Sequence, residues 1–165
     1  MVVGAGLLAT PHQALAAIDA GAHFVMSSQY ATEIDQVCRR RGALYVPGVS
    51  TLHAARRLLE IEVRAVSFFP ARRLGEADLV QISQRCAPLC VVTMGGVAAQ
   101  HLHAYARAGA AAVVVRGVLS AATRWRMHAA IVEMRRLRAM WAKAQLEEQP
   151  PDAWTEDARG HAQTA

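Results

Sequence analysis

The sequence predicts an α/β fold, a TIM-barrel-like (β/α) arrangement with parallel strands in which about six of the eight strand–helix units are present. Short apolar runs alternate with amphipathic segments along the chain, as expected for strands joined by helices. The runs are apolar on both faces, which is typical of parallel strands buried between two layers. They also end in small or turn-forming residues, and in a barrel these loops form the ligand-binding face.

Six apolar runs are the predicted strands. They cover residues 1–5, 23–27, 44–46, 64–69, 89–93 and 112–115. Runs this short suit strands better than helices. The 165 residues are enough for one domain with a real core and too few for two comfortable ones.

Five amphipathic segments between the runs are the predicted helices. They cover residues 11–20, 31–41, 52–60, 76–86 and 98–108. Several are rich in alanine, leucine and arginine, which are good helix formers. Gly21 and Gly109 each stand between a predicted helix and the next strand, where glycine is the usual stop signal.

The alternation ends after residue 118, and residues 121–146 read as one long helix. An apolar stripe at three- and four-residue spacing predicts the face that packs on the sheet. Its members are Met127, Ile131, Met134, Leu137 and Trp141. We therefore predict a domain over residues 1–146 and an acidic, disordered tail over residues 147–165.

The formal charge of +5 is unevenly distributed. Residues 147–165 hold five acids and one arginine, so they contribute −4, and the rest of the chain carries +9. A basic body suits anionic partners, which include phosphorylated or carboxylated small molecules and nucleic acid. The arginines lack the interleaved aromatic residues of a dedicated nucleic-acid binder, so we expect a small anion rather than nucleic acid.

Other features of the composition exclude several classes of protein. Cys38, Cys86 and Cys90 are odd in number and scattered, which predicts reduced thiols in a cytoplasmic protein. No apolar run reaches about 18 residues, so we expect no membrane span. His101 and His103 are two apart on a predicted helix and point in different directions, so they cannot chelate one metal. We expect neither a metal nor a cofactor.

Two glycine sites follow the last two predicted strands. Gly95 and Gly96 follow the strand at 89–93, and Arg116 and Gly117 follow the strand at 112–115. Glycines at such positions let backbone N–H groups converge on an anion, and the last two strands of a barrel often build a phosphate site in this way. The alternative is that both sites are only tight turns.

Residues 3–119 resemble the class I aldolases that cleave 2-keto-3-deoxy-6-phosphogluconate (KDPG) and 4-hydroxy-2-oxoglutarate (KHG). The resemblance is carried, in order, by GAGLLATP (4–11), AAIDAGAHFVMSS (16–28), RGALYVPGVST (41–51), VSFFPA (66–71), MGGV (94–97) and AGAAAVVVRGVL (108–119). It implies a barrel fold, a keto-acid or sugar-phosphate ligand, an aldehyde-lyase of carbohydrate metabolism and a homo-oligomer, commonly a trimer. The substrate- and phosphate-binding residues that it implies are Pro47, Phe69, Thr93, Gly95, Gly96, Arg116 and Gly117.

Ser67 is the main departure from that family. The resemblance places there the lysine that forms a Schiff base with the keto acid, and this reaction needs an amine. A serine hydroxyl cannot form an imine, although it can hydrogen-bond a ligand. Lys143 is the chain's only lysine, and it belongs to the predicted terminal helix.

Further departures affect the general base and the anion sites. The family's glutamate base lies on an early strand, and no segment of this sequence matches that strand. Leu7 and Met94 replace threonines, although Thr93 is adjacent to Met94, and Arg116-Gly117 replaces a Gly-Ser pair. Arg116 could bind an anion, or it could fill the old phosphate pocket.

Three interpretations remain open from the sequence. The first is an aldolase-like protein that has lost Schiff-base chemistry, a pseudoenzyme that still binds an anionic ligand. The second is a working lyase completed by further N-terminal strands or by a partner chain. The third is a non-enzymatic module that binds nucleic acid or an acidic protein through its basic surface.

Overall fold

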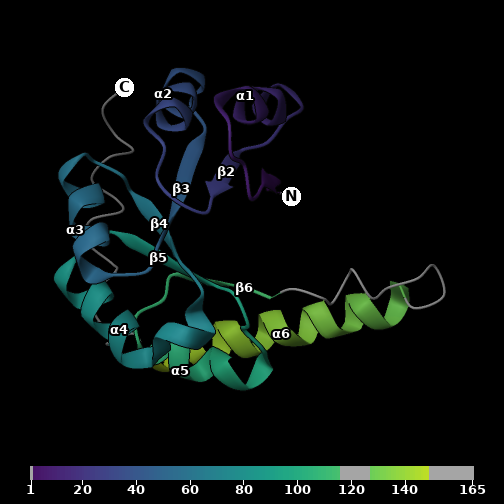
Figure 1. Ribbon diagram of the computed structural model, residues 1–165. Helices are drawn as coiled ribbons and strands as arrows, with labels where there is room; N and C mark the ends of the chain where they lie inside the picture. Colours follow the sequence, from purple (N-terminus) through teal and green to yellow (C-terminus); the bar gives the residue numbers. More distant parts are fainter. Residues whose placement is uncertain (1, 116–126, 149–165) are drawn as a thin grey trace, which may run out of the picture.

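The computed structural model describes residues 2–115 and 127–148 (Figure 1). One sheet of six parallel strands runs in chain order, each strand pairing with the next. The strands are β1 (Gly4–Ala5), β2 (Phe24–Ser27), β3 (Leu44–Val49), β4 (Ala65–Phe68), β5 (Cys90–Met94) and β6 (Ala112–Val114). The sheet curls into a half-barrel, so the predicted α/β class with parallel strands is confirmed.

Helices connect the strands and cover the convex face of the sheet (Figure 1). They are α1 (Pro11–Asp19), α2 (Thr32–Arg41), α3 (Leu52–Glu60), α4 (Ala71–Arg85), α5 (Leu102–Arg107) and α6 (Met127–Glu148), with a short 3₁₀ turn, η1 (Ala99–His101), before α5. The starts of two helices, α1 and α3, follow from local sequence. The Thr10 hydroxyl accepts a hydrogen bond from the Gln13 N–H at 3.2 Å, and Thr51 does the same for the Ala54 N–H at 3.1 Å.

Three predicted boundaries were wrong. β3 continues to Val49, so the residues predicted to form a loop after Val46 belong to the strand. β1 pairs over only two residues. α4 begins at Ala71 rather than Glu76, and non-helical backbone at Gly75 (φ 81°, ψ 173°) divides it, so the predicted helix is its second part.

α6 runs to Glu148 and so includes the first two residues of the predicted acidic tail, whose remainder lies outside the described residues. The predicted start of this helix at residue 121 also lies outside them. The predicted apolar stripe is buried only in part: Leu137 is buried, whereas Ile131 and Met134 are exposed. Figure 1 gives the reason, because the first turns of α6 project beyond α5 and, among the described residues, have no neighbour to pack on.

Alternation along the strands separates the two faces of the sheet. Val66, Phe68 and Val91 point to the helices and join a large core formed with α3, α4, α5 and α6. Met26, Val46 and Ala65 lie on the concave face, with the partly buried Phe24, Val92 and Met94 around them. A separate small core is formed by Ala14, Val25, Ile34, Cys38 and Tyr45. In the part of the chain that the structure describes, no helix is long and apolar enough to cross a bilayer.

Candidate functional site

Ser67 lies on the concave face of the half-barrel. It pairs in register with Gly48 of β3 and Val92 of β5, and it shares the concave face with Ala65, two residues earlier along β4. Its side chain has no exposed surface, and its hydroxyl oxygen has no hydrogen-bond partner within residues 2–115 and 127–148. Most buried polar groups in proteins are hydrogen-bonded, so an orphan of this kind calls for a partner, such as a water or a ligand oxygen.

A tight loop after β5 brings Gly95 against Phe69. Gly95 has a φ of 94°, and a Cβ atom there would lie 2.9 Å from the Phe69 ring, so conformation and space both require glycine. The Arg72 N–H donates to the Gly95 carbonyl at 3.0 Å. A Cβ on Gly96 would lie 2.7 Å from the Cβ of Arg72, so the Arg72 stem runs along this loop.

Arg72 is exposed. Among the described residues, no carboxylate lies within 4.0 Å of its guanidinium. Arg72 therefore adds an uncompensated positive charge beside the glycine pair. The resemblance did not point to this arginine. The sequence feature that could have pointed to Arg72 is the Arg-Arg pair directly after the Phe-Phe-Pro-Ala motif.

The structure brings together only some of the predicted site residues. Thr93 is fully buried and pairs in register with Phe68, so its side chain faces the helices, where its hydroxyl donates to the Ala112 carbonyl at 3.5 Å. Pro47 is buried within β3 and pairs with Ser27. Their side chains point away from the concave face. The other two predicted positions, residues 116 and 117, lie outside the described residues.

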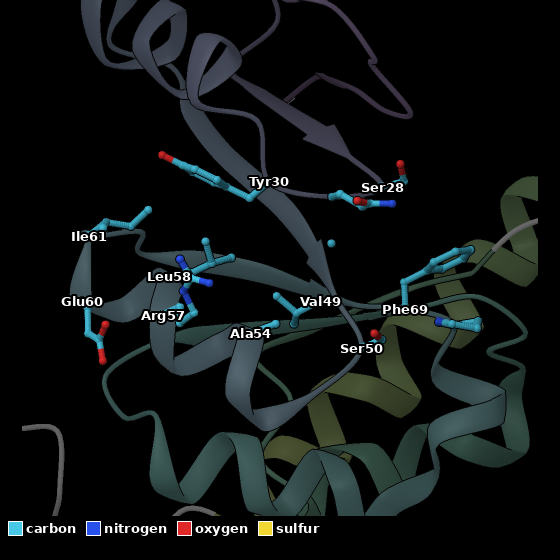
Figure 2. A pocket seen from close by; sticks show the side chains of 13 residues that line it. Ser28, Tyr30, Val49, Ser50, Ala54, Arg57, Leu58, Glu60, Ile61 and Phe69 are labelled. Carbon is cyan, nitrogen blue, oxygen red and sulfur yellow. The ribbon is translucent and has the colours of Figure 1, made fainter.

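A cavity of about 760 Å³ opens beside these residues, at the C-terminal ends of β2, β3 and β4 (Figure 2). The β2–α2 loop forms one wall with Ser28, Gln29 and Tyr30, and α3 forms the opposite wall with Ala54, Arg57, Leu58 and Glu60, continued by Ile61. Gly48, Val49 and Ser50 form the floor, and Phe69 and Pro70 close one end. Of the predicted site residues that the structure describes, only Phe69 contributes to this cavity.

Buried hydrogen bonds fix the β2–α2 loop. The Ser27 hydroxyl lies 2.6 Å from the Tyr45 hydroxyl and 2.5 Å from the Gln29 carbonyl. The Ala31 N–H donates to the Tyr45 oxygen at 3.0 Å. Burial is the main cause that raises the pKa of Tyr45, so this phenol stays protonated at neutral pH. The loop is therefore held from beneath by two neutral hydroxyls.

A second set of polar contacts joins α2 to the end of α3. Arg39 Nε donates to Asp35 Oδ2 at 2.9 Å, and an Arg39 terminal nitrogen donates to the Ile61 carbonyl at 2.8 Å. The Tyr30 hydroxyl donates to the same Asp35 oxygen at 3.1 Å. Burial and then this hydrogen bond raise the pKa of Tyr30. The Tyr30 side chain is thereby held at one end of the cavity.

The two buried thiols, Cys38 and Cys86, do not suit nucleophilic catalysis. Burial is the largest cause that raises the pKa of Cys38 to about 11, and burial also raises the pKa of Cys86. The reactive form is the thiolate, and these thiols stay protonated at neutral pH. Within the described ranges, no three His, Cys, Asp or Glu side chains are grouped closely enough to hold a metal ion.

The sequence matches the family model described as "KDPG and KHG aldolase" over residues 1–133. A 2-dehydro-3-deoxy-phosphogluconate aldolase of Treponema pallidum is 30% identical over 106 residues, which are 64% of this chain and 50% of that protein. The chain thus spans about half the length of the curated relatives that it matches.

Two solved structures illustrate the likeness of fold. A 4-hydroxy-2-oxoglutarate/2-dehydro-3-deoxyphosphogluconate aldolase from TTHB1 is 27% identical, with a TM-score of 0.71 over 90% of this chain and 70% of that one. The KDPG aldolase of Legionella pneumophila, with pyruvate captured as a covalent carbinolamine, is 18% identical, with a TM-score of 0.64 over 88% and 68% of the two chains. At this identity the second structure supports the fold alone.

Proposed function

This chain belongs to the KDPG and KHG aldolase family, and from that premise we propose that it binds a small keto acid or phosphorylated sugar acid without forming a Schiff base. The observation that carries the proposal is the Ser67 hydroxyl, buried on the concave face and without a partner in the described residues. The resemblance assigns this position to the catalytic lysine.

The Ser67 hydroxyl can support ligand binding but not Schiff-base catalysis. An imine makes a keto acid an electron sink, so that a carbon–carbon bond can break toward an enamine, and only an amine can form it. A hydroxyl can instead donate a hydrogen bond to the carbonyl or carboxylate oxygen of the ligand. Leaving a buried polar group without a partner costs about 1–3 kcal/mol. A bound oxygen atom would offset that cost.

The chain's single lysine is a poor substitute for the missing amine. Lys143 lies on α6 with 79% of its side chain exposed, and its Nζ is 3.7 Å from a Glu147 oxygen. The helix that carries this amine packs on the helix-covered side of the sheet, opposite the concave face that carries Ser67.

The anionic end of the ligand would bind at the loop after β5. Gly95 and Gly96 supply closely approachable backbone, and Arg72 supplies a positive charge at the same loop. Guanidinium groups bind phosphate and carboxylate through paired hydrogen bonds. We expect inorganic phosphate to bind more weakly to Arg72→Gln than to Arg73→Gln, because Arg73 is the matched neighbour without the Gly96 contact.

Borohydride trapping tests the loss of Schiff-base chemistry. We expect the protein incubated with pyruvate and borohydride to keep its unmodified mass. A pyruvate adduct on any amine of this chain would contradict the proposal. We further expect Ser67→Lys alone to show no aldol cleavage, because the general base implied by the resemblance has no counterpart in this sequence.

Saturation-transfer NMR with pyruvate tests the binding half of the proposal. The expected result is a signal from pyruvate with the wild-type protein that weakens several-fold in Ser67→Ala. Ser83→Ala is the control, because the Ser83 hydroxyl donates to the Gly109 carbonyl on the helix side of the sheet. No pyruvate signal, or equal signals from all three proteins, would refute a binding role for Ser67.

A second candidate function is a working aldehyde-lyase completed by further strand–helix units or by a partner chain, in an assembly such as a trimer. Two observations favour it: the sheet is an open half-barrel, and the chain spans about half of its curated relatives. In that case the catalytic amine would come from outside these residues. An adduct trapped on a protein that copurifies with this chain would favour this candidate over the first.

A further inference from the structure

We propose that the cavity between the β2–α2 loop and α3 is a second binding site, one that takes a small organic anion with an aromatic or branched apolar body. Its volume of about 760 Å³ lies within the range of small-molecule pockets, roughly 300–1,000 Å³. Such pockets combine an apolar lining with a few polar groups that orient the ligand, and this cavity has both.

The shape of the cavity follows from the sizes of the residues that line it. Small residues occupy its middle, namely Gly48, Ser50 and Ala54. A Cβ on Gly48 would collide with the Ser28 carbonyl, so no larger residue can stand at that position while the loop keeps its place. Large side chains stand at the two ends, with Tyr30, Leu58 and Ile61 at one and Phe69 at the other (Figure 2). A flat or branched apolar body fits between these ends.

The walls of the cavity are fixed before any ligand binds. The Ser27 and Tyr45 hydroxyls hold the β2–α2 loop from the buried side. The hydrogen bond from Arg39 to the Ile61 carbonyl ties α2 to the residue that follows α3. A preformed site loses less conformational entropy on binding than one that must first be ordered.

Arg57 gives the cavity its preference for an anion. Figure 2 shows its guanidinium directed toward the space below Tyr30, whereas the carboxylate of Glu60 points away from that space. Within the described ranges, no acid lies within 4.0 Å of Arg57, Glu60 included. A carboxylate or sulfonate could therefore bind this guanidinium while the apolar part of the ligand covers Leu58 and Tyr30.

The proposed site reaches the concave face at Gly48, which pairs with Ser67, but Ser67 itself is not part of it. Ser67 does not line the cavity, and the α3 residues that do line it lie on the helix side of the sheet. Among the predicted site residues within 2–115, Phe69 alone contributes to its wall. Ligands of the two sites should therefore bind independently, which makes the two proposals separable by experiment.

Anilinonaphthalene sulfonate is a suitable probe, because it joins aromatic rings to one negative charge and fluoresces when bound in an apolar site. We expect saturable binding to the wild-type protein and binding about tenfold weaker to Arg57→Gln. Arg56→Gln is the matched control, because Arg56 is the adjacent exposed arginine of α3 and does not line the cavity. It should bind as the wild type does.

A filling variant tests the location without changing charge. Ala54→Phe places a ring between the two walls and should abolish saturable binding, while circular dichroism and thermal unfolding verify that the protein is folded. Saturating pyruvate should leave binding of the probe unchanged. Equal affinities for Arg57→Gln and Arg56→Gln, retained binding in folded Ala54→Phe, or displacement by pyruvate would each overturn the proposal.

Discussion

The N-terminal region of the molecule (β1, β2, α1 and α2) and its C-terminal region (β4–β6 and α3–α6) are stabilised differently. The C-terminal region contains a core of eighteen buried residues, whereas the core of the N-terminal region has five. Hydrogen bonds compensate in the smaller region, where Tyr45, Ser27 and the Asp35–Arg39 pair tie loop, strand and helix together. The stability of the C-terminal region should therefore be sensitive to the loss of buried side-chain volume. The stability of the N-terminal region should be sensitive to the loss of hydrogen-bond partners.

β3 belongs to both regions. Tyr45 near its start packs into the small core, and Val49 at its end packs into the large one. Tyr30 is the one partly buried side chain packed against both clusters among the described residues. The proposed anion cavity lies at this junction, where neither core fills the space between α2 and α3.

Removing volume from the large core should have the largest effect. Phe68 is fully buried, so Phe68→Ala should reduce the free energy of unfolding by about 3–5 kcal/mol. The measurement is urea denaturation followed by circular dichroism. Phe24→Ala is the comparison, because Phe24 lies only partly buried on the concave face. Equal losses for the two variants would show that the large core does not dominate stability.

Removing the Tyr45 hydroxyl from the N-terminal region should have the second-largest effect on stability. Tyr45→Phe keeps the ring but leaves the Ala31 N–H without its partner and removes one of the two contacts of the Ser27 hydroxyl, which should cost about 1–3 kcal/mol of unfolding free energy. Tyr105→Phe is the matched control in the large core, because its hydroxyl has no hydrogen-bond partner in residues 2–115 and 127–148. A control that loses as much as Tyr45→Phe would remove the contrast between the regions.

The link between α2 and the end of α3 should contribute less. Arg39→Gln removes the contacts to Asp35 and to the Ile61 carbonyl, and because 48% of the Arg39 side chain is exposed we expect a loss of about 1 kcal/mol or less. Arg40→Gln, at the exposed neighbouring position, should change stability little. If the two arginine variants unfold at the same urea concentration, the link does not join the regions.

The smallest effect should be a pH dependence at the contact between α5 and α6. His103 Nε2 lies 2.6 Å from Glu147 Oε2, and this hydrogen bond is the main cause that lowers the pKa of Glu147 below its ordinary 4.5. A lowered carboxyl pKa stabilises the fold above pH 4.5, and the stabilisation is lost as the pH falls through the folded-state value.

The difference in stability between wild type and His103→Ala should therefore be present at pH 6 and shrink as the pH falls below 4.5 through the lowered pKa of Glu147. Thermal unfolding across that range measures it. His128→Ala, at an exposed position near the start of the same α6 helix, is the control and should show no such convergence. A His103→Ala difference that persists in acid would mean that packing, not the charge of Glu147, is responsible.

Much of the site could not be predicted from the sequence, because the role of a residue depends on which side of the sheet its side chain faces. Pro47 stands in a matching motif and Thr93 directly precedes one, yet the register with Ser27 and Phe68 turns both side chains toward the helices. Arg57 and Tyr30 carry no motif at all. They meet across a cavity only because α2 and α3 are spaced apart over β3, and that spacing depends on contacts between distant segments.

What the sequence determined by itself was the order and kind of the elements, and the absence of an amine at position 67. Apolar runs, glycine stops and the capping residues Thr10 and Thr51 are local signals, and local backbone preference and hydrophobic periodicity are enough to interpret them. Only the tertiary structure decided that the Ser67 hydroxyl is buried without a partner and that the Arg72 stem lies along Gly96. Both depend on how neighbouring strands pair and curl, and no single segment encodes that geometry.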